Sequence, residues 1–223
     1  MVSISTLLQK WNISCVIFDL DGTLTDTLDL HVKAFQILFQ ELNISIPKDK
    51  IEENMGRTPK DTLKTLVPQL VSSEKKLELL ADKKEHHLRE LLEEIKLFPG
   101  AQALIKRTKK LVEKICLASS TPKENVLKIL RETSLEKKFD VIVTGEEITI
   151  GKPDPQIFEK AAKKANKSRK ECLVIGDSTH DILAAKQANM KIIAVTTGKH
   201  SPEQLKRFDP NIIINSLTEL LNQ

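Results

Sequence analysis

Short hydrophobic runs recur along the chain, and each is bounded by polar or turn-forming residues and followed by a stretch with helical spacing. Within each run the hydrophobic residues are consecutive rather than alternate, which is typical of strands buried on both faces. The pattern therefore predicts an α/β fold, in which a parallel sheet carries helices on both faces. The predicted strands are residues 15–18, 115–118, 141–143, 172–175 and 192–195.

Residues 25–96 interrupt this rhythm, because they contain no convincing strand and are rich in Leu, Lys and Glu at helical spacing. Apolar residues recur there at intervals of three and four and form one stripe that can pack against neighbouring helices: Leu77, Leu80, Ala81, Leu88, Leu91, Leu92 and Ile95. A Phe-Pro-Gly sequence at 98–100 then marks the return to the α/β pattern. We expect a Rossmann-like core domain at 1–24 and 97–223, and a small all-helical domain at 25–96.

Several helix starts carry the pattern of a capping box, in which a Ser or Thr side chain bonds the backbone three residues later. Segments 121–124, 201–204 and 216–219 have this pattern, and Pro122 suits the first helical position of the first segment. Asp154 followed by Pro155 is another predicted start. Each start falls after a predicted strand or its loop, where the crossover helices of a parallel sheet begin.

Composition narrows the expected partners and location. The net charge is +4, and the Lys-rich stretch 163–170 has no aromatic residues for base stacking, so nucleic acid is not an expected partner. No apolar run approaches the roughly 18 residues of a membrane span, so a membrane is not expected either. Cys15, Cys116 and Cys172 lie in predicted strands, without the spacing of a metal clamp. They fit buried thiols in a reducing compartment, and we expect a cytoplasmic protein.

Carboxylates follow two of the predicted strands. Asp19 and Asp21 leave the first strand on alternate positions just before Gly22, and Asp177 follows the fourth strand, with Asp181 four residues beyond. Ligands of open α/β sheets bind at this edge, and close carboxylates repel one another unless a cation or a shared proton relieves them. Such oxygen ligands suit a hard cation, most often Mg²⁺. Taken alone, Asp177 is explained equally well as a turn residue or a helix cap.

The ends of the second and third predicted strands offer groups that suit a phosphate. Ser119 and Ser120 precede a helix start, where backbone N–H groups and a hydroxyl can bind an anion. A Ser in such a position usually only caps the helix, so this motif alone is weak. Lys152 lies between Gly151 and Pro153, and the proline restricts it to extended geometry. A lysine fixed in this way can hold a transferring phosphoryl group and offset the carboxylates.

These four elements, in this order and each at the carboxyl end of a strand, resemble the motifs of the haloacid dehalogenase superfamily. The resemblance covers nearly the whole chain, and the predicted helical domain is similar to the cap that this superfamily places between its first two motifs. The dehalogenases that give the superfamily its name do not match this chain at Asp21 or at the second acidic cluster. The resemblance therefore implies phosphoryl transfer to or from a small phosphorylated metabolite.

The resemblance also implies a role for each motif residue. Asp19 would be the nucleophile that becomes a phospho-aspartate, and Asp21 the general acid and base. Ser119 and Lys152 would bind the phosphoryl oxygens, together with the backbone amides that follow Asp19 and Ser119, which adds Ser120 to the substrate contacts. Mg²⁺ would be held by Asp19, Asp177 and the backbone carbonyl of Asp21, with Asp181 acting through water or by orienting its neighbours.

Hydrolysis of a small phosphomonoester, of the phosphoglycolate or sugar phosphate class, is the first expectation. A β-phosphoglucomutase-like activity is the alternative, because residues 25–27, His31 and Arg57 resemble features of that subgroup as well as those of related phosphatases. A regulatory protein without turnover is a third interpretation. The complete set of motif residues argues against it, since a degenerate member would be expected to lack at least one.

His31 and Arg57 are candidate substrate contacts in the helical domain. His31 shares a helical face with Phe35, Leu38 and Leu42, which fits a partly buried structural histidine at least as well as a role in cap closure or proton transfer. Arg57 lies in a predicted loop, from which a guanidinium can bind an anion through two hydrogen bonds. An ordinary surface arginine is an equally good interpretation of Arg57.

Overall fold

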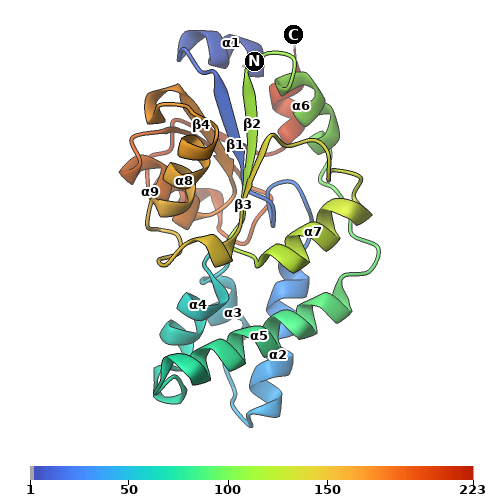
Figure 1. Ribbon diagram of the computed structural model, residues 1–223, viewed down its shortest axis with the longest axis vertical. Coiled ribbons are helices and arrows are strands. Elements are labelled where there is room, and N and C mark those ends of the chain that lie inside the picture. Colours follow the sequence, from blue (N-terminus) through green and yellow to red (C-terminus); the bar gives the residue numbers. More distant parts are fainter. Residues whose placement is uncertain (1–2, 223) are drawn as a thin grey trace.

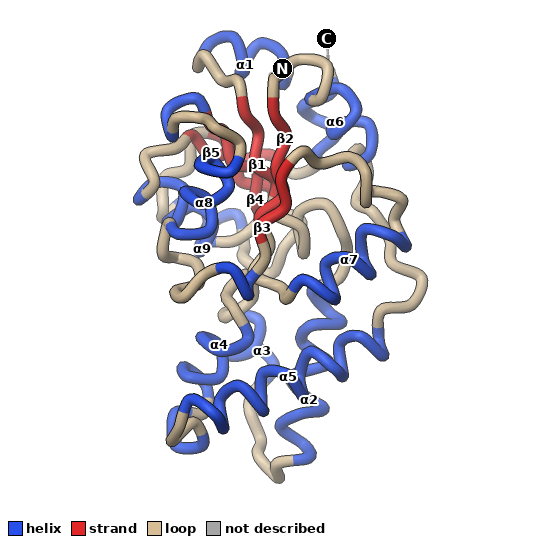
Figure 2. Tube along the Cα trace, in the orientation of Figure 1, coloured by secondary structure: helices blue, strands red, loops and turns tan. Residues whose placement is uncertain are grey.

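Six parallel strands form a single sheet in the computed structural model, which describes residues 3–222, and their order is β3-β2-β1-β4-β5-β6. Figure 2 shows the strands running side by side through the upper half of the molecule. The predicted α/β fold with a parallel sheet is confirmed. The strands are β1 (Cys15–Phe18), β2 (Lys114–Ala118), β3 (Val141–Val143), β4 (Cys172–Gly176), β5 (Lys191–Val195) and β6 (Ile212–Ile214).

The edge strand β6 is one that the hydrophobic pattern did not predict. It consists of three consecutive Ile residues between Asn211 and Asn215, and it pairs in parallel with residues 193–195 of β5. A run of three residues is shorter than a typical strand of about five to six. Its pairing with β5, rather than a local signal, makes this segment a strand.

Alternate residues of the strands point to opposite faces of the sheet, and helices cover both faces. The face that includes Phe18 and Leu117 packs against α1 (Ile4–Lys10), α6 (Ala101–Thr108), α7 (Lys123–Glu132) and the 3₁₀ helix η4 (Leu217–Leu221). The face that includes Ile17 and Ala118 packs against α8 (Gln156–Lys164), α9 (Thr179–Gln187) and α10 (Pro202–Lys206). This two-sided burial explains why the strand sequences are continuously hydrophobic.

Four further helices pack on one another below the sheet in Figure 1, and we call them the helical unit: α2 (Leu28–Glu41), α3 (Lys48–Glu52), α4 (Pro59–Leu66) and α5 (Glu74–Leu91). They bury a hydrophobic cluster of their own, which includes Phe35, Leu63 and Leu80. Short 3₁₀ helices complete the described elements, as η1 (Pro68–Leu70), η2 (Gly145–Glu147) and η3 (Arg169–Glu171). That residues 25–96 form a separate cap domain remains a prediction.

The helix starts match the capping patterns in part. Ser201 and Ser216 form the predicted capping boxes, the second of which begins a 3₁₀ helix. The predicted box at 121–124 is wrong, because α7 begins at Lys123 after Pro122 and has no side-chain cap. The hydroxyl of Thr121 instead donates a hydrogen bond to Asp21, which lies far away in the sequence. A long-range partner has therefore replaced the local one.

Two further expectations concern buried cysteine thiols and membrane-spanning helices. Cys15, Cys116 and Cys172 are buried free thiols, as expected. A hydrogen bond with Cys116, together with burial, raises the pKa of the Cys15 thiol and makes it a poor nucleophile. Within residues 3–222, none of the helices combines the length and hydrophobicity that a membrane span requires.

Helix α5 is attached to the core through polar contacts with α7. Asn125 of α7 is fully buried, and its Nδ2 donates to the Glu85 backbone oxygen (3.0 Å) and to Glu85 Oε2 (2.6 Å). Its Oδ1 accepts a hydrogen bond from Nε of Arg89 at 3.0 Å. Arg89 also forms an ion pair with Glu124, with Nη2 and Oε2 2.7 Å apart. Asn125 thus joins the helical unit to the face of the sheet that carries α7.

We predict that Asn125→Ala lowers the free energy of unfolding by about 1–3 kcal/mol, because it leaves buried polar groups of α5 without partners. Urea unfolding measures the change. Lys123→Ala, at an exposed position on the same helix, is the matched control and should have little effect. Equal stabilities of the two variants would contradict a structural role for Asn125.

Candidate functional site

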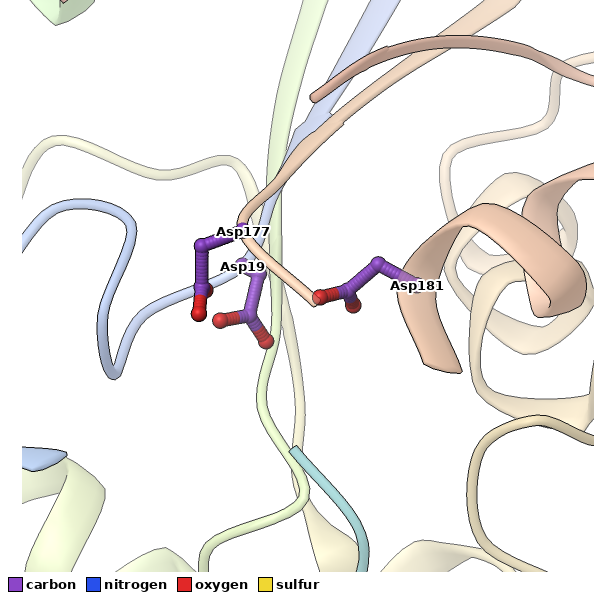
Figure 3. Close-up of side chains that lie close together, drawn as sticks. All are labelled: Asp19, Asp177 and Asp181. Atoms are coloured by element: carbon purple, nitrogen blue, oxygen red, sulfur yellow. The ribbon is translucent and has the colours of Figure 1, made fainter. Parts of the chain in front are cut away.

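Three buried carboxylates meet at the carboxyl ends of the central strands. Asp19 follows β1, Asp177 follows β4, and Asp181 lies in the first turn of α9. One oxygen atom from each lies within 4.8 Å of the others. Figure 3 shows Asp19 between the other two, with Asp181 pointing toward it from the helix. Parallel strands end at one edge of the sheet, so residues far apart in the sequence converge there.

Two glycines make room for Asp177. Gly22 has a φ of +87°, and a Cβ atom at this position would lie 2.6 Å from Asp177 Oδ2. A Cβ atom on Gly198 would lie 1.9 Å from the same oxygen. Thr23, one residue beyond Gly22, donates a hydrogen bond of 2.7 Å to Asp177 Oδ1. The turn after β1 thus needs glycine both for its conformation and for the close approach of the carboxylate.

Lys152 lies among these carboxylates and is fully buried. Its Nζ lies 2.5 Å from Asp19 Oδ1 and 2.7 Å from Asp181 Oδ1, and it donates to the backbone oxygen of Ala118 at 3.2 Å. Burial alone would lower the pKa of this lysine, but attraction to Asp181 and Asp19 outweighs that effect and raises the pKa. Lys152 is therefore held in its charged form, as a single cation among three carboxylates.

The three carboxylates differ in how well their charge is balanced. Burial raises the pKa of Asp19 to about 8, in spite of its contact with Lys152. Burial and repulsion by Asp181 and Asp19 raise the pKa of Asp177 well above its usual value. For Asp181, attraction to Lys152 and hydrogen bonds with Lys152 and Ser178 outweigh burial and lower the pKa. A divalent cation fits this set of oxygen ligands, because it would balance the charge that Lys152 leaves uncompensated.

Asp21 is also buried, but its side chain belongs to a different set of contacts. Oδ1 accepts a hydrogen bond from Thr27 Oγ1 at 2.6 Å and lies 3.2 Å from His31 Nε2. Oδ2 accepts hydrogen bonds from Ser119 Oγ at 3.2 Å and from Thr121 Oγ1 at 2.9 Å. Burial would raise the pKa of Asp21, but attraction to His31 and these hydrogen bonds outweigh it and hold the pKa well below the usual range. Groups from both the core and α2 thus stabilise the ionised carboxylate.

A buried chain of polar side chains leads from Asp21 into the helical unit. His31 Nδ1 lies 3.0 Å from Lys84 Nζ, and Lys84 Nζ donates to Glu85 Oε1 at 2.7 Å. Glu85 in turn bonds Asn125 of α7. Lys84 was not identified from the sequence, although it interrupts the apolar stripe of α5 between Ala81 and Leu88. A charged residue within an apolar stripe is the signal that could have found it.

The structure places the remaining predicted contacts as follows. The hydroxyl of Ser120 donates to the backbone oxygen of Gly56 at 2.8 Å, which joins the core to the helical unit. Nη1 of Arg57 donates to Asn54 Oδ1 and Thr65 Oγ1, at 2.9 and 2.8 Å, so the guanidinium is bound within the helical unit. Thr23 and Lys84 are contacts that the sequence analysis did not include, and the place of Thr23 beside the first acidic motif is the only signal it carries. Thr27 and Thr121 lie in the segments 25–27 and 121–124, which the sequence analysis singled out for other reasons.

A small cavity of about 20 Å³ lies between the sheet edge and the helical unit, and its lining includes Asp19, Asp21, His31, Arg57 and Ser120. A space of this size holds little more than one water molecule. The helical unit is therefore closed over the carboxylates in this structure. The raised and lowered pKa values described above belong to this closed arrangement.

We predict that the metal-free protein becomes less stable as the pH rises from about 5 to 8. The pKa values of Asp19 and Asp177 are raised in the folded state, so the stability from their protonated forms is full near pH 4 and is lost as the pH rises through about 8. Urea unfolding in EDTA measures the slope. Asp177→Asn, a neutral side chain of the same shape, should make the slope smaller, and an unchanged slope would refute the prediction.

Comparison with known proteins shows the family to which this chain is similar. A family model described as haloacid dehalogenase-like hydrolase matches residues 16–195. The pyrophosphatase PpaX of Listeria monocytogenes serotype 4b is 29% identical over 211 residues, which are 94% of this chain and 95% of that protein. A phosphorylated carbohydrates phosphatase of Thermotoga maritima is 32% identical over 216 residues, which are 92% of this chain and 99% of that protein. By name, these two sequence relatives are a pyrophosphatase and a phosphatase of phosphorylated carbohydrates.

Solved structures of a hydrolase and of a phosphoglucomutase have the same fold as this chain. A hydrolase from Pseudomonas syringae has a TM-score of 0.86 and 30% identity, and the match covers 94% of this chain and 97% of that one. A β-phosphoglucomutase from Clostridium difficile has a TM-score of 0.83 and 29% identity, with 93% of each chain covered. With its parallel sheet and converging carboxylates, the chain therefore belongs to the haloacid dehalogenase-like hydrolases, a family of enzymes.

Proposed function

We propose that this enzyme is a Mg²⁺-dependent phosphatase, which hydrolyses a small phosphomonoester through a phospho-aspartate at Asp19. The observation that carries the proposal is the contact of Asp19 with Lys152, 2.5 Å apart and buried, within the group of three carboxylates. This arrangement offers an oxygen nucleophile beside a fixed positive charge. Phosphoryl transfer requires little more than such placement and charge balance. The names of the sequence relatives support the same reaction class.

In the first step, a carboxylate oxygen of Asp19 forms a bond to phosphorus as the bond to the leaving oxygen breaks. Lys152, held by Asp181, balances charge on the phosphoryl oxygens, and Ser119 and the backbone amide of Ser120 are the proposed hydrogen-bond donors to them. Mg²⁺, held by Asp19, Asp177 and the backbone carbonyl of Asp21, would supply further positive charge for the same oxygens. Asp181 then acts by positioning Lys152.

Asp21 is proposed as the general acid and base. Asp21 is ionised in the closed structure, because its pKa is lowered, so it can accept a proton in the second step from the water that hydrolyses the phospho-aspartate. For the first step, it must carry a proton to give to the leaving oxygen. His31 Nε2, at 3.2 Å, can supply that proton if Lys84 Nζ, 3.0 Å from Nδ1, passes one of its own to the imidazole. His31 is thus a proton carrier in this proposal rather than only a structural residue.

The closed cavity requires that the helical unit move to admit a substrate, because a phosphate group does not fit in a space of about 20 Å³. The segments on either side of the helical unit pair through an antiparallel bridge between Thr25 and Leu97. They are the natural place for a hinge. Closure after binding would bring His31 to Asp21 and exclude bulk water from the reaction.

A sugar phosphate mutase is the second candidate, and the contact between His31, Lys84 and Asp21 favours it. A relay of this kind can deliver a proton to, or remove one from, a sugar hydroxyl as readily as a water molecule. The closed cavity would also protect a phospho-aspartate from water while a sugar reorients. The two candidates share every residue named above and differ in the molecule that accepts the phosphoryl group.

We predict that Asp19→Asn lowers phosphate release from small phosphomonoesters roughly 10³-fold or more, because an amide cannot act as the nucleophile. EDTA should abolish the activity of the wild-type enzyme, and added Mg²⁺ should restore it. Asp209→Asn, at a highly exposed carboxylate, is the control and should retain activity. Turnover by Asp19→Asn at the wild-type rate would refute the nucleophile.

The choice between hydrolysis and isomerisation is testable with β-glucose 1-phosphate and its bisphosphate activator. We expect phosphate release to exceed the formation of glucose 6-phosphate, because the relatives identified by sequence are phosphatases. A coupled assay for glucose 6-phosphate and a colorimetric phosphate assay on the same sample give the ratio. Conversion much faster than phosphate release would replace the phosphatase with the mutase.

A further inference from the structure

A groove of about 930 Å³ continues outward from the small catalytic cavity. Pro59, Glu85 and Ser120 line both spaces, so the groove begins where the cavity ends. Its walls come from α4 and α5 on one side, and from the start of α7 and the segment after β3 on the other. A leaving group that extends beyond the cavity at Asp19 would therefore enter this groove.

The groove carries a marked excess of negative charge. Three basic side chains line it, at Lys60, Lys64 and Arg89. Seven carboxylates line it, so the formal charge of the lining is −4: Asp61, Glu74, Glu78, Asp82, Glu85, Glu124 and Glu146. This local charge contrasts with the net charge of +4 of the whole chain.

Acidic residues of the same groove neutralise two of the three cations. Lys60 Nζ lies 3.3 Å from Glu74 Oε1 and 2.9 Å from Glu78 Oε1. Arg89 is bound to Glu124 and Asn125. Lys64 alone has no acidic partner among the residues that the structure describes.

Two of the carboxylates, in contrast, are available to a ligand. Asp82 and Glu146 are both exposed, and no basic side chain in residues 3–222 pairs with either of them. They lie on opposite walls, with Asp82 on α5 and Glu146 on the segment after β3. A leaving group in the groove would thus meet negative charge from both sides.

We infer that the leaving group of the substrate carries a protonated amine and no second anionic group, as in an amino alcohol or amino sugar phosphate. This inference rests on the proposed phosphatase activity. Lys152 satisfies the charge of the reacting phosphoryl group, whereas a second phosphate or carboxylate would enter a groove of like charge. Such a cleft raises the local concentration of ligands of opposite charge about tenfold or more, and lowers that of like charge.

The test uses two series of phosphomonoesters of similar size that differ mainly in the charge of the leaving group. Phosphoethanolamine, ethylene glycol monophosphate and 2-phosphoglycolate form the first series. Glucosamine 6-phosphate, glucose 6-phosphate and 6-phosphogluconate form the second, so the result does not depend on size. With Mg²⁺ at neutral pH and low salt, kcat/KM should fall about tenfold or more from the amine to the anion in each series, and added salt should reduce the difference.

The double variant Asp82→Lys/Glu146→Lys tests the cause. It should weaken or reverse the preference in each series, by raising kcat/KM for the anionic ester and lowering it for the amine. The double variant Glu132→Lys/Glu136→Lys has the same change of charge at exposed positions outside the groove, and should keep the wild-type order. Thermal unfolding of each variant shows that the fold is retained.

The outcomes separate this inference from the activity on which it rests. Equal kcat/KM values along each series, or a preference for the anionic ester, would overturn the inference and leave the phosphatase intact. A preference that the double variant leaves unchanged would also overturn it, because the groove would not be its source. Failure to hydrolyse any ester, p-nitrophenyl phosphate included, would refute the phosphatase and with it the inference.

Discussion

The contact of Lys152 with Asp19 and Asp181 is the interaction on which the site depends. Charged groups are costly to bury unless they are paired, and here one ammonium group lies among three buried carboxylates. The pairing is incomplete, which is why the pKa values of Asp19 and Asp177 are raised and why the oxygens fit a divalent cation. The same imbalance makes the site receptive to positive charge at the edge where the reaction would occur.

Asp21 contacts both the core and the helical unit. This carboxylate accepts hydrogen bonds from Ser119 and Thr121 of the core, and it contacts His31 of α2. His31 continues through Lys84 to α5, which the buried Asn125 attaches to α7. Movement of the helical unit would therefore remove His31 from Asp21 and change the affinity of the Asp21 carboxylate for a proton. In the proposed mechanism, substrate access and acid–base chemistry would thus depend on one set of contacts.

The site and the groove beside it have opposite electrostatic requirements. At Asp19, a lysine and a proposed cation compensate for negative charge, so a phosphoryl group can be accepted. In the groove, Lys60 and Arg89 are neutralised by neighbouring carboxylates, while Asp82 and Glu146 are left without basic partners in the described part of the chain. Recognition of the phosphoryl group and selection of the leaving group are thus assigned to different parts of the molecule.

The sequence by itself determined the sheet and the place of the acidic motifs. Continuous apolar runs mark doubly covered strands, and parallel strands end at one edge, so Asp19 and Asp177, which directly follow strands of one sheet, were expected to approach one another. Lys152 lies nine residues beyond β3, so its contact with Asp19 was decided by the fold of that loop. Only the tertiary structure decided that β6 is a strand and that Thr121 bonds Asp21 rather than capping α7. It also decided that Lys84 meets His31 and that Arg57 is bound within the helical unit. These contacts join residues from different elements, and a periodicity along the chain carries no information about such partners.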